Sequence, residues 1–307
     1  MTVSLVSTDS AMSPTSSPMT AHMVLDRELL MANLNTRACW VRHNLANHPL
    51  FEMSRLLQLA KYLPDKYVRI NNGRSEVATT PDQIPGRKLS IEESFERMAE
   101  TDTRIMLKKI ELEPAYQRLL HECIDEIVAL GHPSMQGIWY RVGYVFISAP
   151  NQTTPYHMDP EINFLLQVRG NKTFFVLNGE DRSILSEEAL ELFFSGRHHS
   201  LAFDESWRGK AVAFEMAPGT GVHIPVTHPH WVTTPNEISI SLALTVQTHE
   251  TQRRGMIYGF NDRLRHWGIT PTPFGQSATG DWLKYHAFRA MSAAKSILQG
   301  KKQDTAH

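Results

Sequence analysis

The feature that most constrains the fold is a series of short apolar segments in the second half of the chain. They are rich in β-branched and aromatic residues, and turn residues such as Asn178-Gly179 and Pro218-Gly219 separate them. Many short strands with turn signals at this spacing are typical of an antiparallel jelly roll or barrel. The expected strands cover residues 138–148, 163–168, 172–177, 211–216, 222–224 and 238–246.

Helical patterns lie on both sides of this series. Ser90-Ile91-Glu92-Glu93 predicts a capping box, and Pro114 and Gly131 mark the two ends of a second helix. Residues 105–112 have the apolar content of a strand, 187–195 form a helical insertion, and 281–299 return to helix. We therefore predict a mainly β core with α flanks in four parts. These are a disordered tail (1–22), a helical N-terminal region packing on the core (23–135), the core (136–250) and a helical C-terminal region (251–307).

The charge of the chain argues against two classes of partner. Lys plus Arg number 31 and Asp plus Glu 32, so the formal net charge is −1. This balance gives no electrostatic footprint for nucleic acid or an anionic membrane. The sequence has no apolar run long enough to cross a bilayer and no signal-peptide pattern. It predicts a soluble, cytoplasmic protein without a nucleic-acid or membrane partner.

Three residues form a candidate metal site. His157 and Asp159, in Thr154-Pro-Tyr-His157-Met-Asp159, make the one His-x-Asp pair among 15 histidines, and His230 follows in a second histidine-containing segment just before the last expected strand. Alone, the pair is equally compatible with a surface turn. Two histidines and one carboxylate on neighbouring strands occupy three positions of an octahedral iron and leave three open. The motif does not exclude Zn, Mn or Ni, and His228 competes with His230 as the distal ligand.

A cation stands in an apolar strand close to these residues. Lys172 opens the segment Lys-Thr-Phe-Phe-Val-Leu, where burying a charge is costly unless an anion pairs with it. We expect Lys172 to hold a dicarboxylate, and the hydroxyl of Thr154 can donate a hydrogen bond to the same carboxylate. The alternative is an edge-strand lysine that faces solvent.

Together these segments resemble a known family. Thr154-Pro-Tyr-His157-Met-Asp159, then Asn163, then Gln167-Val-Arg-Gly170-Asn-Lys172, and later His230-Trp-Val, look like the JmjC or cupin-like branch of the Fe(II)- and 2-oxoglutarate-dependent oxygenases. That branch includes the asparaginyl hydroxylase acting on hypoxia-inducible factor. The resemblance covers about residues 138–246 and implies a double-stranded β-helix.

The resemblance also implies roles for single residues. His157, Asp159 and His230 are expected to bind Fe(II), while Lys172 and Thr154 hold the distal carboxylate of 2-oxoglutarate. Asn163 is expected near the metal and the co-substrate. Ser241, where some relatives carry Asn, is expected to contact the co-substrate as well. Tyr140 and Tyr144 are further candidates to contribute a phenol to the pocket.

The implied reaction consumes O₂ and 2-oxoglutarate and hydroxylates a C–H bond of a protein or peptide side chain or of a small metabolite. Hydroxylation at an N-methyl carbon would amount to demethylation. One rival is a metal-dependent cupin isomerase or hydrolase in which Lys172 is only structural. The other is a non-enzymatic JmjC-like regulatory protein. We also expect the N-terminal region to help form the substrate pocket and the C-terminal helices to build a homodimer.

Overall fold

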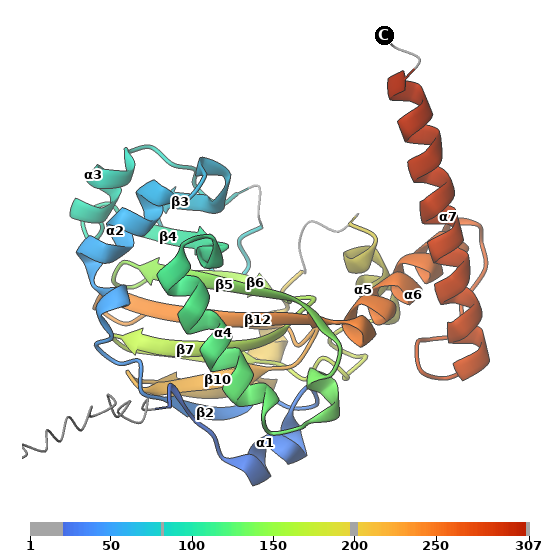
Figure 1. Ribbon diagram of the computed structural model, residues 1–307, viewed down its shortest axis with the longest axis horizontal. Coiled ribbons are helices and arrows are strands. Elements are labelled where there is room, and N and C mark those ends of the chain that lie inside the picture. Colours follow the sequence, from blue (N-terminus) through green and yellow to red (C-terminus); the bar gives the residue numbers. More distant parts are fainter. Residues whose placement is uncertain (1–20, 81–82, 197–201, 305–307) are drawn as a thin grey trace, which may run out of the picture.

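The computed structural model of the protein describes residues 21–80, 83–196 and 202–304. Two antiparallel sheets pack face to face, and helices cover the outer face of the larger sheet (Figure 1). Apolar side chains of both sheets, among them Leu165 and Ala243 from one and Phe174 and Val232 from the other, fill the space between them. Among the described residues, no helix combines the length and apolar character needed to cross a bilayer.

The eight core strands, β5 to β12, pass back and forth between the two sheets, with β8 and β9 as a consecutive pair in the same sheet. In the large sheet the order is β1-β2-β10-β7-β12-β5-β4-β3, and in the small sheet β6-β11-β8-β9. This arrangement confirms the predicted double-stranded β-helix. The core strands are β5 (Ile138–Ser148), β6 (Thr153–His157), β7 (Ile162–Arg169), β8 (Lys172–Val176), β9 (Val212–Met216), β10 (Thr220–Ile224), β11 (His230–Thr233) and β12 (Ser239–Thr248).

The central strands β7 and β12 of the large sheet are buried on both faces, and most of their residues are apolar. In β7, Asn163, Leu165 and Gln167 point toward the small sheet, and the alternate residues pack against the outer helices. Helix α4 (Pro114–Val128) covers that outer face with an apolar stripe. The Glu113 side chain caps its first turn, and Gly131 follows its end with a φ of +76°.

The N-terminal region differs from the prediction over residues 23–135, because it contains strands as well as helices. It adds β1 (Met23–Val24), β2 (Cys39–His43), β3 (Val68–Asn72) and β4 (Thr103–Lys108) to the edges of the large sheet. The segment expected as a strand over 105–112 is β4 followed by a 3₁₀ turn at Ile110–Leu112. The pairing partners explain the difference, since β2 pairs with β10 and β4 with β5, both distant in sequence.

The helices agree more closely with the sequence patterns. The capping box at Ser90 is present at the start of α3 (Ile91–Glu96). The other helices are α1 (Arg27–Asn33), α2 (Met53–Tyr62), α5 (Glu187–Phe194), α6 (His249–His266) and α7 (Ala278–Asp304). The expected tail over 1–22 lies outside the described residues except for residues 21 and 22. There, the backbone and ring of His22 contact the carboxylates of Glu126 and Glu122 on α4.

Candidate metal centre and co-substrate pocket

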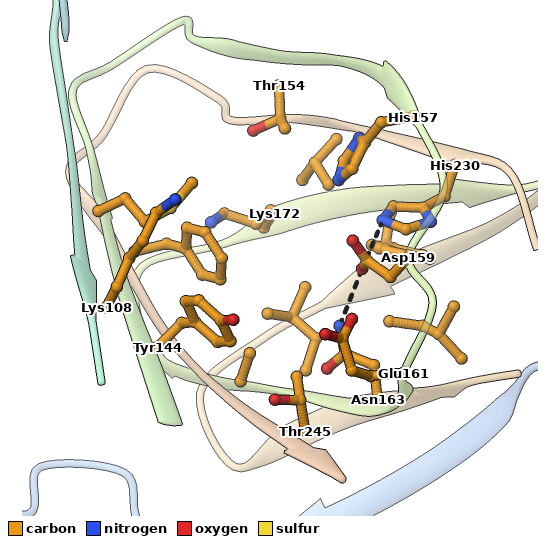
Figure 2. Close-up of a pocket in the computed structure, with 17 residues that line it drawn as sticks. Lys108, Tyr144, Thr154, His157, Asp159, Glu161, Asn163, Lys172, His230 and Thr245 are labelled. Atoms are coloured by element: carbon orange, nitrogen blue, oxygen red, sulfur yellow. Dashed lines mark hydrogen bonds and ion pairs between the residues drawn. The ribbon is translucent and has the colours of Figure 1, made fainter. Parts of the chain in front are cut away.

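Three candidate ligands converge at one end of the small sheet. His157 ends β6 and His230 begins β11, and the two are direct cross-strand partners with ring centroids 4.2 Å apart. Asp159 follows β6, and its Oδ2 lies 3.7 Å from Nε2 of His230. One ligand atom from each of the three side chains lies within 4.8 Å of the others (Figure 2). His228 is not part of this group. Its ring Nδ1 lies 3.4 Å from the carbonyl oxygen of Val226.

Each histidine is held so that one particular ring nitrogen is free. Nδ1 of His157 lies 2.7 Å from the Pro155 carbonyl oxygen, and Nδ1 of His230 lies 2.9 Å from the His228 carbonyl oxygen. A carbonyl oxygen only accepts, so both Nδ1 atoms carry the hydrogen and donate it, leaving the Nε2 lone pairs for a metal. Burial, followed by the proximity of His157, lowers the pKa of His230 to about 4. The neutral imidazole that a metal requires is therefore the stable form of His230.

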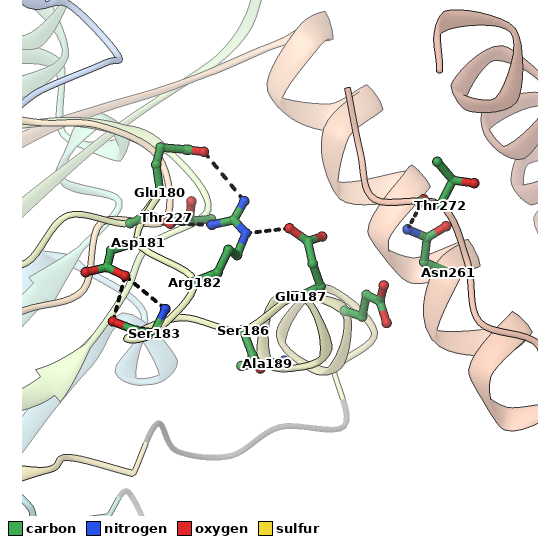
Figure 3. Close-up of polar contacts among 12 residues, drawn as sticks. Glu180, Asp181, Arg182, Ser183, Ser186, Glu187, Ala189, Thr227, Asn261 and Thr272 are labelled. Atoms are coloured by element: carbon green, nitrogen blue, oxygen red, sulfur yellow. Dashed lines mark hydrogen bonds and ion pairs between the residues drawn. The ribbon is translucent and has the colours of Figure 1, made fainter. Parts of the chain in front are cut away.

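A strained turn brings His230 into place. Thr227 has a φ of +63°, which is unfavourable for a β-branched residue, and its backbone N–H donates to the carbonyl of Asp159 at 2.9 Å. From α6, Arg254 donates to the Thr227 hydroxyl at 3.3 Å. Beside this turn, Arg182 pairs with Glu187 at the start of α5 at 2.5 Å (Figure 3). The turn thus links both ligand-bearing segments to α6.

Asn163 and His223 support the carboxylate ligand. Nδ2 of Asn163 donates to Oδ2 of Asp159 at 3.2 Å, while its Oδ1 is buried without a partner among the described residues. Behind it, Nε2 of His223 accepts from the Asn35 backbone at 2.8 Å, so Nδ1 carries the hydrogen and donates to the Asn163 carbonyl at 3.1 Å. Burial lowers the pKa of His223 to about 3, so this histidine is neutral. It positions Asn163 and takes no part in the metal site.

The donor set fits a divalent transition metal. Two imidazoles and one carboxylate lie on one side, and a cavity lies on the other, which leaves room for further ligands. The unpaired Oδ1 of Asn163 provides a buried acceptor beside the same space. A donor set of this composition suits Fe(II), and it does not by itself reject manganese or nickel.

The cavity has a volume of about 250 Å³ and lies between the two sheets. Lys172 projects from β8 into the wall of the cavity (Figure 2). Its Nζ donates to the Ser241 hydroxyl at 2.9 Å. Burial, followed by the charge of Arg104, lowers the pKa of Lys172 to about 7. The cavity is lined by Met106, Lys108, Tyr144, Phe146, Thr154, His157, Asp159, Glu161, Asn163, Leu165, Lys172, Phe174, Ile224, His230, Val232, Ala243 and Thr245.

Ser241 was expected to contact the co-substrate, and in the structure it lies directly behind Lys172. Ser241 does not line the cavity, and its hydroxyl donates its hydrogen to Oε1 of Gln167 at 2.7 Å. Its oxygen accepts from Lys172, so Ser241 orients the lysine and has no hydrogen left for a ligand. Gln167 in turn donates to the carbonyls of Arg169 and Gly170 at 2.8 Å, which fixes the turn that leads into β8.

A β-bulge explains how Thr154 and His157 both face the cavity although they are three residues apart on β6. His230 pairs with His157, but Val232 pairs with Thr154, so β6 carries one extra residue between the two pairs. Residues three apart on a regular strand point to opposite faces, and the extra residue turns Thr154 and His157 to the same face. The Thr154 hydroxyl makes no hydrogen bond within the described part of the chain, which leaves it free to donate to a ligand.

Several lining residues were not identified from the sequence. Glu161 is half-buried near Asp159 and accepts from Gln247 at 3.1 Å. Desolvation, then the charge of Asp159, raises its pKa to about 7. Its position two residues after Asp159 and directly before β7 was an available signal. Of the two tyrosine candidates, Tyr144 lines the cavity and Tyr140 does not. Lys108 had no local signal, because β4 reaches the cavity only through long-range pairing.

Comparison with known proteins gives a fold likeness. Sequence searches find no matching family model and no matching curated protein. Among solved structures, ribosomal oxygenase YcfD from Escherichia coli matches with a TM-score of 0.52 at 13% identity, over 89% of this chain and 68% of that chain. YcfD in complex with cobalt and 2-oxoglutarate matches with a TM-score of 0.52 at 14% identity, over 84% and 60%.

A further YcfD structure matches with a TM-score of 0.50 at 15% identity and covers 85% of this chain. The match spans only 61% of the length of that YcfD chain. At this level of identity the comparison concerns architecture alone: the chain has the fold of the ribosomal oxygenase YcfD.

Proposed function

We propose that this protein is an Fe(II)- and 2-oxoglutarate-dependent oxygenase that hydroxylates a C–H bond of its substrate. The observation that carries the proposal is one cavity that contains both a three-ligand metal centre and a buried lysine. Among the described residues, Lys172 has no carboxylate partner, and a buried cation calls for an anion. A co-substrate that has a chelating keto acid at one end and a carboxylate at the other would satisfy both the metal centre and the buried lysine. The YcfD structure with cobalt and 2-oxoglutarate supports this reading.

Each residue then has a defined task. Nε2 of His157 and of His230 and the carboxylate of Asp159 would hold the iron. The Lys172 ammonium and the Thr154 hydroxyl would donate to the distal carboxylate of 2-oxoglutarate. When bound together, iron and 2-oxoglutarate supply the oxidant that places one oxygen atom of O₂ in the C–H bond, while 2-oxoglutarate becomes succinate and CO₂. Apolar walls of the cavity, including Phe146, Leu165 and Phe174, exclude water from this space.

The substrate of this reaction follows from the sequence in broad terms only. We infer a protein or peptide side chain or a small molecule, modified in the cytoplasm. Hydroxylation is the default outcome, and an N-methyl substrate would instead lose formaldehyde. The resemblance to the asparaginyl hydroxylase branch stays a prediction, because the solved structures compared above are ribosomal oxygenases.

The experiment that tests the proposal is anaerobic reconstitution with Fe(II), followed by addition of 2-oxoglutarate and recording of the visible spectrum. We expect a weak metal-to-ligand charge-transfer band in the wild type. The band should be absent in His157→Ala, which loses a ligand, and should require much higher 2-oxoglutarate in Lys172→Met. Lys109→Met is the matched control, because this lysine lies outside the cavity and stacks on the ring of Tyr67.

Two other outcomes would favour the rival functions. Iron binding without the band, and without an effect of Lys172→Met, would favour a metal-dependent cupin isomerase or hydrolase in which this lysine is structural. No metal binding at all would favour a non-enzymatic regulatory protein. That second rival agrees less well with the geometry, since its ligand side chains would not need to converge, whereas here their ligand atoms lie within 4.8 Å of one another.

A further inference from the structure

Strand β4 carries a row of positive charge beside the cavity. Its odd-numbered residues are buried in the core, and the alternate residues Arg104, Met106 and Lys108 point to the opposite face. Met106 and Lys108 line the cavity, and Figure 2 shows Lys108 on the wall that also bears Tyr144. A strand from the N-terminal region therefore extends the inner face of the core and brings a second lysine to the pocket.

The register of the sheet adds another cation to this row. Lys108 pairs with Tyr144 of β5, and Met106 pairs with Arg69 of β3, so all of them share one face. Arg69 is consequently a diagonal neighbour of both Arg104 and Lys108, at a spacing of about 7 to 8 Å. Three cations thus lie close together on one face of the sheet, where like charges repel, and Lys108 is the one of the three that lines the cavity.

No protein anion compensates this cluster in the described part of the chain. Neither Lys108 nor Arg69 makes an ion pair there, and Arg104 donates only to the Thr153 carbonyl, at 3.1 Å. Burial, followed by the charge of Arg69, lowers the pKa of Lys108. The two carboxylates that line the cavity, Asp159 and Glu161, lie on the other side of it (Figure 2). The cluster would be relieved by an anion that enters from outside.

The co-substrate leaves this charge uncompensated. Iron(II), the Asp159 carboxylate, the 2-oxoglutarate dianion and the Lys172 ammonium together have no net charge. Lys172 is the fully buried cation, held by Ser241, and so suits the distal carboxylate. Lys108 lines the same cavity but is only half-buried, so it is more accessible than Lys172 to a group that enters from outside.

We propose that Lys108 binds an anionic group of the substrate, a carboxylate or a phosphate, next to the C–H bond that is oxidised. This inference rests on the proposed oxygenase function and adds the class of substrate, namely an acidic one. Arg69 and Arg104 strengthen the local positive potential without contacting the group directly.

The test uses the full chain loaded with Mn(II) and saturated with 2-oxoglutarate under argon, so that no turnover occurs. Three probes that differ in one group are added: the N-acetyl amides of aspartate, O-phosphoserine and asparagine. Paramagnetic broadening of the acetyl-methyl proton signal reports binding close to the metal. We expect the acetyl-methyl signal of the aspartate probe, of the phosphoserine probe or of both to broaden. The neutral asparagine probe should bind at least about tenfold more weakly. Whichever anion binds more tightly identifies carboxylate or phosphate as the recognised group.

Variants decide whether Lys108 is responsible. Lys108→Met should weaken binding of the anionic probe about tenfold or more and leave 2-oxoglutarate affinity unchanged, while Lys109→Met should behave as the wild type. The proposal is overturned if neither anion broadens in the wild type or if Lys108→Met binds the anion normally. It is also overturned if Lys108→Met weakens 2-oxoglutarate, which would assign Lys108 to the co-substrate. Failure of Mn(II)-loaded wild type to bind 2-oxoglutarate would instead count against the oxygenase function itself.

Discussion

Lys172 is an ionisable side chain that is almost fully buried in the folded protein. Its side chain is 5% exposed, its one hydrogen-bond partner among the described residues is a neutral hydroxyl, and Arg104 repels it. A lysine in such surroundings destabilises the free protein, and proteins tolerate this where a ligand supplies the missing anion. The same features that make Lys172 unfavourable in the empty cavity make it selective for a carboxylate.

The pH dependence of stability should reveal this penalty. The folded-state pKa of Lys172 is about 7, below its ordinary value of 10.5, so between these pH values the unfolded chain binds more protons. The free energy of unfolding should therefore rise with pH across this window. In Lys172→Met, without metal or 2-oxoglutarate, that contribution disappears. The variant should be more stable than the wild type by roughly 2 to 4 kcal/mol near pH 7. This difference in the free energy of unfolding should become smaller toward about pH 10.

Urea denaturation of the metal-free wild type and Lys172→Met at several pH values measures this difference. Taking the difference between the two proteins removes the titration of other groups, such as Glu161. Lys109→Met serves as the control and should follow the wild-type profile. Parallel profiles for wild type and Lys172→Met would mean that Lys172 has an ordinary pKa and is not desolvated in the folded protein.

Residue types and spacing predicted only part of the site. His157, Asp159 and Lys172 stood out because their motif or their apolar surroundings were unusual in the sequence itself. The hydrogen bonds of Ser241 were not predicted, because the direction of its hydroxyl depends on Gln167, on a neighbouring strand. Lys108 could not be found at all, because its access to the cavity depends on the pairing of β4 with β5.

At the scale of elements, the turn between β7 and β8 sets the position of Lys172. Gly170 has a φ of +65°, and a Cβ there would lie 2.3 Å from the carbonyl oxygen of Ile238. Gly131 offers a matched comparison, since its φ is +76° but a Cβ there would meet nothing within 4 Å. The two glycines share the backbone conformation and differ in the space around them.

Alanine at these two positions should separate conformational strain from steric clash. Gly131→Ala should reduce the free energy of unfolding by about 1 kcal/mol, the cost of the left-handed conformation alone. Gly170→Ala should reduce it by roughly 2 to 4 kcal/mol, because the β7–β8 turn must also shift away from Ile238. That shift moves Lys172, so 2-oxoglutarate affinity should fall in Gly170→Ala only. Urea denaturation and 2-oxoglutarate titration check both effects, and equal losses in the two variants would contradict the role of the clash.

The elements themselves were predictable where local pattern and final pairing agree. The long strands β5 and β12 carry dense β-branched and aromatic residues, and their expected ranges nearly match the observed ones. The short strands β6 and β11 were not predicted. Pro155 interrupts the strand pattern of β6, and a histidine-rich turn precedes β11. Strands β2 and β3 show only a short alternation of apolar and polar residues. They form because β10 and β4 provide pairing partners from distant parts of the chain.

At the scale of the whole molecule, the C-terminal helices contact the turn next to the metal centre, and they also expose apolar side chains to solvent. Arg254 of α6 contacts the turn before His230, and Arg265 of α6 pairs with the buried Glu191 of α5. Beyond α6, helix α7 projects away from the sheets (Figure 1). At the junction of α6 and α7, four large apolar side chains are more than half exposed: Trp267, Ile269, Trp282 and Leu283.

A homodimer through these helices is the last prediction. A helix as long as α7 gains most of its stability from packing, and exposed aromatic and aliphatic side chains at its base indicate an interaction surface. A second copy, related by a two-fold axis, offers the same surface in return. Light scattering should therefore give twice the mass of one chain for the wild type. The double variant Trp282→Glu with Leu283→Glu should give the mass of one chain, whereas Leu112→Glu, at an exposed site outside the helices, should remain a dimer. A monomeric wild type at micromolar concentration would refute this assembly and leave the apolar residues of α7 for a different partner.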